Sequence, residues 1–130
     1  MKKYCFIFLV FIYLASCDDI SRSEIEGKWQ LKTVEKAGME ITVDTVWYNF
    51  QSKSIFQYQF FISQQDTFML LPGVVKSNQV NILHLELITN EHLDQTDWHG
   101  INRSFTIEKL DKKNLILVGE EGYSYSFIRF

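Results

Sequence analysis

The stretch at residues 91–100 holds the densest group of side chains that are able to do chemistry. It contains three carboxylates, two histidines and one tryptophan, which are Glu91, Asp94, Asp97, His92, His99 and Trp98. Carboxylates and imidazoles are ligands that zinc and other divalent ions bind in proteins. Their spacing matches no defined ligand motif, however, and we predict no metal site. A second interpretation is a polar lip at the mouth of a cavity, where Trp98 supplies apolar contact and the carboxylates exclude anions.

Motifs of known catalytic chemistry are missing from the sequence. There is no Gly-x-Ser-x-Gly elbow, no glycine-rich phosphate loop and no His-Glu-x-x-His pair. Glu120 and Glu121 are paired carboxylates, but neighbours in a tight turn point apart and lie in water. We therefore predict that the protein is not an enzyme and uses no cofactor.

The elements that must position these residues are strands. Of the 130 residues, 46% are apolar and 15% are aromatic, which excludes disorder and favours the pleated surface of a sheet. From Gly27 onward, apolar residues recur with a period of two. After one helical turn at residues 23–26, the expected strands span residues 28–36, 39–44, 45–50, 55–62, 67–71, 80–89, 104–110, 115–119 and 123–130, with a break at Pro72-Gly73 before Val74-Val75.

The number and spacing of these strands predict one all-β domain. Eight or nine short strands joined by hairpin-length turns imply an antiparallel meander. A meander removes its exposed edges most simply by closing on itself, so we expect an eight-stranded barrel. The chain is long enough for one such core and too short for two.

The first and last expected strands carry residues suited to sealing one end of the barrel. Gly27 allows a tight bend, and Trp29 follows it on the same strand face as Leu31. Arg129, next to last in the chain, is a natural lid for the indole, because a guanidinium stacks on an aromatic face and keeps its charge when sheltered. We predict that Gly27, Trp29 and Arg129 hold the closed end.

The interior of an eight-stranded barrel can be filled by its own side chains or can hold one small ligand. The candidate ligand pocket is an apolar stripe on two expected strands, made of Phe56, Tyr58, Phe60, Leu83, Leu85 and Leu87. The same stripe also predicts a packed core, and both interpretations stay open. Trp47 and Phe61 lie on the less apolar faces of their strands and would mark a contact surface if they are exposed.

The N-terminus reads as an export segment. Lys2 and Lys3 give a basic start, and the apolar run at residues 4–14 is too short to span a membrane as a helix. The run ends in Leu14-Ala15-Ser16-Cys17, which resembles the lipobox of bacterial lipoproteins. That resemblance implies a signal peptide at residues 1–16, a lipid on Cys17 and a tether at residues 17–24. The alternative is an ordinary cleavage site with an incidental cysteine.

The net charge and the residues after Cys17 indicate which partners and which location to expect. Removal of Lys2 and Lys3 lowers the 13 basic residues to 11 against 16 acidic ones, a formal charge of −5. Nucleic acid is therefore not an expected partner. Asp18 and Asp19 look like the surface-export signal of Bacteroidetes-type lipoproteins, although a solvated tether needs no signal. We expect a lipid anchor in the membrane, most simply the outer membrane, with the face left open.

The Gly27-Lys28-Trp29 opening, the meander and the closing strand at residues 123–130 together resemble the small lipocalin-like lipoproteins of Bacteroidetes-type bacteria. The resemblance covers residues 25–130 and implies a calycin-type barrel in the cell envelope that binds or carries a small apolar or amphipathic ligand. The alternative function is an interaction module whose filled barrel contacts an envelope protein or a glycan complex. A ligand carrier needs an internal cavity, whereas the interaction module needs a packed interior with Trp47 or Trp98 exposed.

Overall fold

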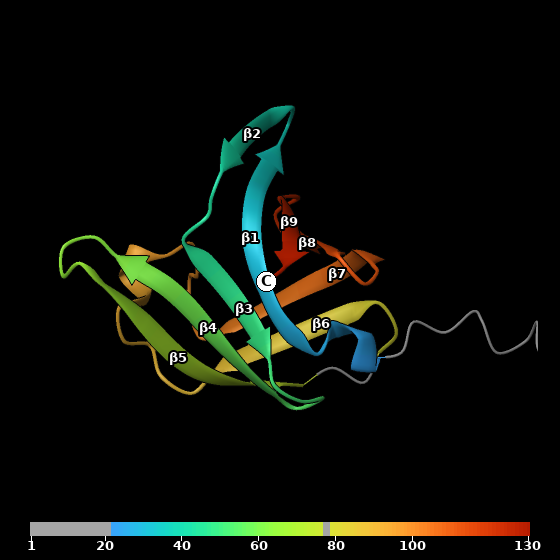
Figure 1. Ribbon diagram of the computed structural model, residues 1–130, viewed down its shortest axis with the longest axis horizontal. Helices are drawn as coiled ribbons and strands as arrows, with labels where there is room; N and C mark the ends of the chain where they lie inside the picture. Colours follow the sequence, from blue (N-terminus) through green and yellow to red (C-terminus); the bar gives the residue numbers. More distant parts are fainter. Residues whose placement is uncertain (1–21, 77–78) are drawn as a thin grey trace, which may run out of the picture.

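The computed structural model describes residues 22–76 and 79–130, so the expected signal peptide, Cys17 and most of the tether lie outside the described residues. Within these residues, nine strands and two short 3₁₀ helices follow one another (Figure 1). Their bounds are η1 (Arg22–Ile25), β1 (Gly27–Lys36), β2 (Met39–Thr42), β3 (Val46–Phe50), β4 (Ile55–Ile62), β5 (Thr67–Val75), β6 (Ile82–Leu87), η2 (Leu93–Gln95), β7 (Asn102–Leu110), β8 (Asn114–Gly119) and β9 (Ser124–Arg129).

The sheet closes on itself because β1 pairs with β9. The strand order is β2-β1-β3-β4-β5-β6-β7-β8-β9, with the additional pairing of β1 and β9. This last ladder is antiparallel and runs from Trp29 opposite Arg129 to Glu35 opposite Ser124. When β2 is set aside, the remaining eight of the nine strands form the closed ring. The all-β, eight-stranded barrel expected from the sequence is confirmed.

One edge of β1 is shared between two partners. The ladder from Gly27 to Gln30 pairs with β3, whereas the ladder from Thr33 to Lys36 pairs with β2. Ala37 and Gly38 join β1 to β2 with positive φ angles of 53° and 81°, as a tight hairpin of two residues requires. The hairpin of β1 and β2 therefore extends beyond the barrel as an arm beside its open end (Figure 1).

The break expected at Pro72-Gly73 is wrong, because β5 continues through both residues. The Pro72 carbonyl accepts a hydrogen bond from the Ile88 amide at 3.0 Å. The nitrogen and the carbonyl of one strand residue point to the same side, so the proline nitrogen, which has no hydrogen to donate, also faces β6. At this point the ladder between β5 and β6 ends. At Gly73, a Cβ atom would lie 2.4 Å from Cε1 of Phe56 and 2.7 Å from the Glu86 carbonyl oxygen. Both residues are thus compatible with a strand at this position, and Gly73 is there for close packing rather than for a turn.

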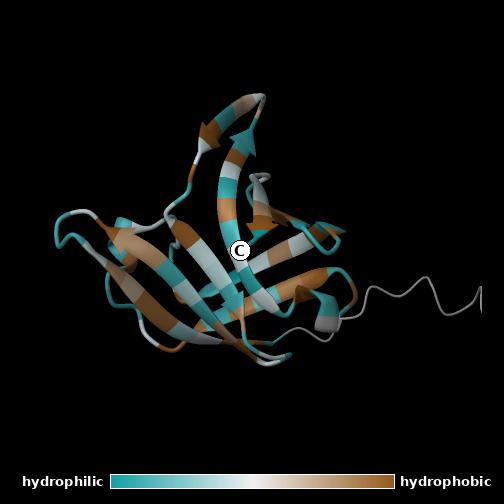
Figure 2. Ribbon diagram, in the orientation of Figure 1, coloured by the Kyte–Doolittle hydropathy of each residue, from teal (hydrophilic) through white to brown (hydrophobic). Residues whose placement is uncertain are grey.

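The core follows from the alternation along the strands. Apolar and polar bands alternate along β1, β3 and β4 (Figure 2), and in β4 the even-numbered residues from Phe56 to Ile62 are all buried. Tyr48 lies in the middle of the interior, with its ring centre 4.9 Å from that of Phe127 and 5.5 Å from that of Tyr58. Side chains from opposite walls of the barrel therefore meet in its centre.

The turn between β7 and β8 gives a test of how stability depends on pH. Asp111 Oδ1 accepts the amide hydrogens of Lys113 and Asn114 at 2.8 and 2.7 Å, and these two bonds lower the pKa of its carboxyl group. A lowered pKa means that the carboxylate stabilises the fold above its unfolded pKa of about 3.9, and that this stability is lost as the pH falls through the folded value. Asp111→Ala should lower the Tm at pH 7, and the difference from the wild type should shrink by pH 2.5.

Asp111→Asn is the matched control, because its amide oxygen still accepts a hydrogen bond but does not titrate over this range. Its Tm relative to Asp111→Ala should hardly depend on pH. A wild-type advantage over Asp111→Ala that is equally large at pH 2.5 and pH 7 would show that the turn is not held by the carboxylate.

Candidate functional site

One end of the barrel is sealed by Trp29. The indole is 0% exposed, and its Nε1 donates to the Ile25 carbonyl at 2.8 Å, which joins η1 to the barrel. The Arg129 guanidinium carbon lies 4.2 Å from the centre of the indole. Gly27 has a φ angle of +126°, and a Cβ atom there would lie 2.4 Å from Nη1 of Arg129. The structure thus brings Gly27, Trp29 and Arg129 together at this closed end.

Arg129 also ties the N-terminal turn to the last strands. Its Nη1 and Nη2 donate to the carbonyls of Glu26 and Glu24 at 2.7 and 2.8 Å, and its Nε donates to the Lys112 carbonyl at 2.7 Å. This side chain of β9 therefore holds two backbone segments that are far apart in the sequence, the one at residues 24–26 and the β7–β8 turn.

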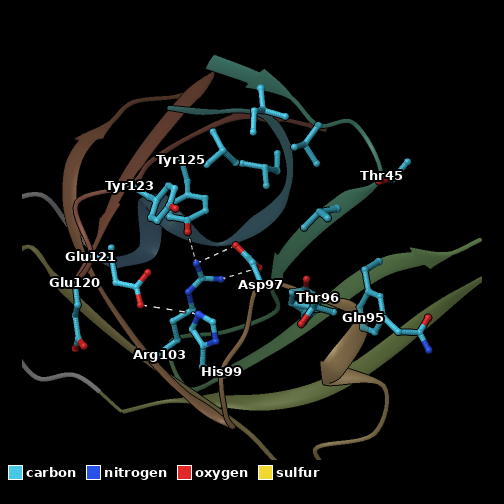
Figure 3. A pocket seen from close by; sticks show the side chains of 18 of the residues that line it. Thr45, Gln95, Thr96, Asp97, His99, Arg103, Glu120, Glu121, Tyr123 and Tyr125 are labelled. Atoms are coloured by element: carbon cyan, nitrogen blue, oxygen red, sulfur yellow. Dashed lines mark hydrogen bonds and ion pairs between the residues drawn. The ribbon is translucent and has the colours of Figure 1, made fainter. Parts of the chain in front are cut away.

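The opposite end of the barrel is hollow. A cavity of about 850 Å³ opens there, within the range of roughly 300–1,000 Å³ typical of small-molecule sites. Its apolar wall comes from β1, β3, β4 and the arm, and includes Leu31, Val34, Val43, Val46 and Phe60. The facing side is polar and comes from the β6–β7 loop, the start of β7, the β8–β9 turn and the start of β9 (Figure 3).

The six residues predicted as a pocket divide between the cavity and the core. Tyr58 and Phe60 line the cavity. Phe56, Leu83, Leu85 and Leu87 are 0%, 4%, 1% and 0% exposed and belong to the packed core. The stripe is therefore core toward the closed end and cavity wall toward the open end.

At the inner end of the polar side lies a cation, Arg103, whose side chain is 15% exposed. Its Nη1 and Nη2 donate to Oδ1 and Oδ2 of Asp97, each at 3.0 Å. Nη1 also donates to the Tyr48 hydroxyl at 3.4 Å, and Nη2 donates to the Tyr125 hydroxyl. The guanidinium carbon lies 4.8 Å from the ring centres of both Phe105 and Tyr125. Arg103 thus joins β3, β7, β9 and the loop before β7. Figure 3 shows its bonds to Asp97 and Tyr125.

Burial and pairing fix the charges around Arg103. Burial raises the pKa of Tyr48 and of Tyr58 far above the ordinary tyrosine value, and it raises the pKa of Tyr125 to about 12. Burial alone would lower the pKa of Arg103, but its electrostatic interactions with Tyr48 and Asp97 outweigh burial and raise that pKa. At neutral pH the cluster of Arg103, Asp97, Tyr48 and Tyr125 therefore holds one cation, one anion and two neutral phenols, and the nearby Tyr58 is a neutral phenol as well.

The β6–β7 loop borders the cavity through Gln95, Thr96, Asp97 and His99. This position is the one that its interpretation as a lip requires. Trp98 differs from the expectation, because it is 4% exposed and points into the barrel. Its ring stacks on Phe56 at 6.3 Å with an interplanar angle of 16°, and it meets Tyr58 edge-on at 5.3 Å. Packing against the aromatic interior is more favourable for the indole than exposure to solvent. Trp98 therefore anchors the loop and does not line the mouth.

Trp47 is also buried, at 8% exposure, although it lies on the outer face of β3. Phe68 and Phe130 cover it edge-on, with ring centres 5.4 and 5.9 Å away. Phe61 is half-buried and borders the cavity. The interaction-module interpretation expects a packed interior and an exposed Trp47 or Trp98. In the described part of the chain the interior is packed only toward the closed end, and both tryptophans are buried.

Neither a metal-binding cluster nor a membrane-spanning helix is present within residues 22–76 and 79–130. In these ranges no group of three or more His, Cys, Asp or Glu side chains is placed to hold a metal ion. His99 lies 3.9 Å from Glu121, and both side chains are largely exposed. No helix in the same ranges is long and apolar enough to cross a membrane.

Arg103 is not predicted as a site residue from the sequence, because it is the last residue of a polar stretch. Its place in the alternating pattern of the strand could have identified it. Arg103 is two residues before the buried Phe105, and it pairs across strands with the buried Leu85. An arginine in phase with an apolar strand face is a charge aimed at the interior.

A closed antiparallel barrel with one sealed end and a cavity at the other has the architecture of a small ligand-binding barrel. Residues 12–130 match the family described as lipocalin-like domain, and the chain belongs to that family.

Two crystal structures share the fold. A lipocalin-like protein from Bacteroides uniformis ATCC 8492 superposes with a TM-score of 0.73 at 26% identity, covering 82% of this chain and 99% of the other. An uncharacterized protein from Bacteroides eggerthii DSM 20697 gives a TM-score of 0.68 at 23% identity, covering 81% and 98%. No curated protein matches the chain. The comparisons therefore define the family and the fold.

Proposed function

We propose that this protein is a lipid-anchored lipocalin-like protein of the cell envelope that binds or carries a small amphipathic molecule. The observation that carries the proposal is the cavity of about 850 Å³, with an apolar wall on one side and a polar wall on the other. Such a division suits a ligand with an apolar body and a polar end, because each part of the ligand then meets a surface of its own kind. We place the protein among binding proteins and not among enzymes.

The proposed anchor is compatible with an accessible cavity. Lipidated Cys17 precedes Arg22, the first residue of η1, by five residues, which reach at most about 18 Å when fully extended. Because Ile25 of η1 accepts the hydrogen bond from Trp29, the anchor joins the domain at the closed end. The mouth of the barrel is then left free for ligand exchange, most simply at the outer membrane.

The ligand is tested with a series of alkyl amphiphiles of increasing chain length. Each methylene buried against the apolar wall contributes about 0.8 kcal/mol, so the affinity should rise about fourfold per methylene until the cavity is full. Titration followed by tryptophan fluorescence measures the Kd, because Trp98 contacts the cavity-lining Tyr58. Native mass spectrometry of protein purified gently from its own host should show a bound molecule of the same class.

Two substitutions make the titration specific for the cavity. Val34→Trp places a larger side chain in the cavity and should weaken binding, most for the longest chains, whereas Thr106→Trp adds an indole to an exposed position on β7 and should not. Absence of binding at every chain length, together with a clean apo mass, would refute the carrier function.

The anchor has its own test in Cys17→Ser. The serine cannot form the thioether to lipid, so the protein should move from the membrane fraction to the soluble fraction. Fractionation of cells without detergent and immunoblotting measure the change. A variant that still requires detergent for release would contradict the lipoprotein assignment.

A further inference from the structure

Both terminal nitrogens of Arg103, the basic group that lines the cavity, are already engaged. Each terminal nitrogen of Arg103 donates two hydrogen bonds, one to Asp97 and one to a tyrosine hydroxyl. Neither nitrogen has an N–H left for an incoming anion, and the Asp97 carboxylate cancels the charge of the guanidinium. To reach the terminal nitrogens, an anionic ligand would have to displace Asp97, and this exchange offers no gain in the number of hydrogen bonds.

The remaining charges around the cavity are mostly negative. Asp97, Glu120 and Glu121 line it, against Arg103 as the one arginine and no lysine among the lining residues. Glu120 and Glu121 lie on the β8–β9 turn at the rim, beside Tyr123 (Figure 3). The rim thus carries two carboxylates close in sequence to an aromatic ring, and one of them, Glu121, lies 3.9 Å from His99.

A lysine ammonium group of the protein already lies against the Tyr123 ring at the rim. Nζ of Lys36, at the end of β1, lies 4.4 Å from the centre of the Tyr123 ring. Lys36 is two residues after the cavity-lining Val34 and therefore shares its inward face. An ammonium group is an electrostatic match for an aromatic face, so the rim accepts a primary amine in the unliganded protein.

From these contacts, and on the basis of the proposed carrier function, we propose that the ligand is a cationic amphiphile. Its ammonium group lies at the rim against Tyr123, Glu120 and Glu121, where it takes the place of the Lys36 ammonium. Its apolar body lies against the wall formed by β1, β3, β4 and the arm. Arg103 and Asp97 form a neutral inner surface that an alkyl chain passes without meeting a net charge.

The test compares three probes with one alkyl chain, namely decyltrimethylammonium, decanol and decanoate, each below its micelle concentration. Calorimetric titration of the Cys17→Ser protein, in which every described residue is unchanged, gives the three Kd values. Decyltrimethylammonium should bind about tenfold more tightly than decanoate in about 10 mM salt, and the ratio should fall at 0.5 M salt.

Two variants give opposite expected shifts for the ammonium probe. Glu120→Gln with Glu121→Gln removes the rim charges and should weaken its binding about fivefold, with decanol unaffected. Lys36→Gln frees the Tyr123 face and should tighten its binding about threefold. All of these positions are exposed, so the variants should fold like the wild type.

The outcomes separate this inference from the carrier function. Equal binding of the three probes, tighter binding of decanoate, or unchanged ammonium binding in the double glutamine variant overturns the cationic ligand and leaves the carrier function standing. If no probe binds at all, the cavity is not a ligand site, and both proposals fall.

Discussion

Trp29→Ala is expected to lower the free energy of unfolding by about 3–5 kcal/mol, the range found when a large buried aromatic is truncated. The indole is 0% exposed, so its removal leaves a cavity at the closed end. It also leaves the Ile25 carbonyl without the donor 2.8 Å away and removes the ring beneath Arg129. Urea unfolding followed by circular dichroism measures the loss from the midpoint and the m-value.

Trp47→Ala is the matched control, since it deletes the same side chain from the outer face of the barrel. Trp47 has no hydrogen-bond partner for its Nε1, and flexible neighbours such as Lys28 and Phe130 are free to close over the space. Its loss should be less than half that of Trp29→Ala. A loss below about 1 kcal/mol for Trp29→Ala would rule out its role as the plug of the closed end.

Much of the fold can be predicted because strands carry a local pattern. The period of two identifies β1, β3 and β4 and assigns their inward faces, and short turns between strands leave a meander as the simplest topology. Closure is also accessible from sequence, since Trp29 and Arg129 complement each other chemically and lie near the two ends of the domain. Pro72-Gly73 shows the limit: the pair favours a turn locally, but its neighbours in β4 and β6 decide that it is strand.

The position of the cavity could not be predicted from the same pattern. Alternation shows which face of a strand is buried, but it does not show how deep along the barrel axis a residue lies. Phe56 and Phe60 share one face of β4, yet Phe56 packs in the core and Phe60 lines the cavity. Height along the axis depends on strand tilt and register, which long-range pairing sets.

The Arg103 cluster is harder still to predict, because it is assembled across the fold. Its partners Tyr48 and Tyr125 are 55 and 22 residues away in the sequence, and each looks like an ordinary core aromatic in its own strand. Asp97 lies in a polar loop where acidic residues are common. Only the closed barrel brings the four side chains together, so the cluster has no motif of its own.

Asp97→Asn is expected to act on stability and on ligand choice together. The loss of the carboxylate leaves Arg103, whose side chain is 15% exposed, without a counter-charge. The free energy of unfolding should fall by about 2 kcal/mol, less than the 3–5 typical of a fully buried pair, because Asp97 itself is 51% exposed. The freed guanidinium then becomes a site for a carboxylate, so decanoate should bind at least about tenfold more tightly than to the wild type.

Asp94→Asn removes the same charge from an exposed position of the same loop that does not line the cavity, and it is the control for net charge. It should change neither stability nor the affinity for decanoate. Arg103→Met combined with Asp97→Asn removes both charges, and it should lose the gain in decanoate binding while recovering part of the stability. If Asp97→Asn and Asp94→Asn behave alike, the ion pair neither stabilises the barrel nor excludes anions. If only the stability changes, the pair is structural, and the preference against anions must come from the rim carboxylates.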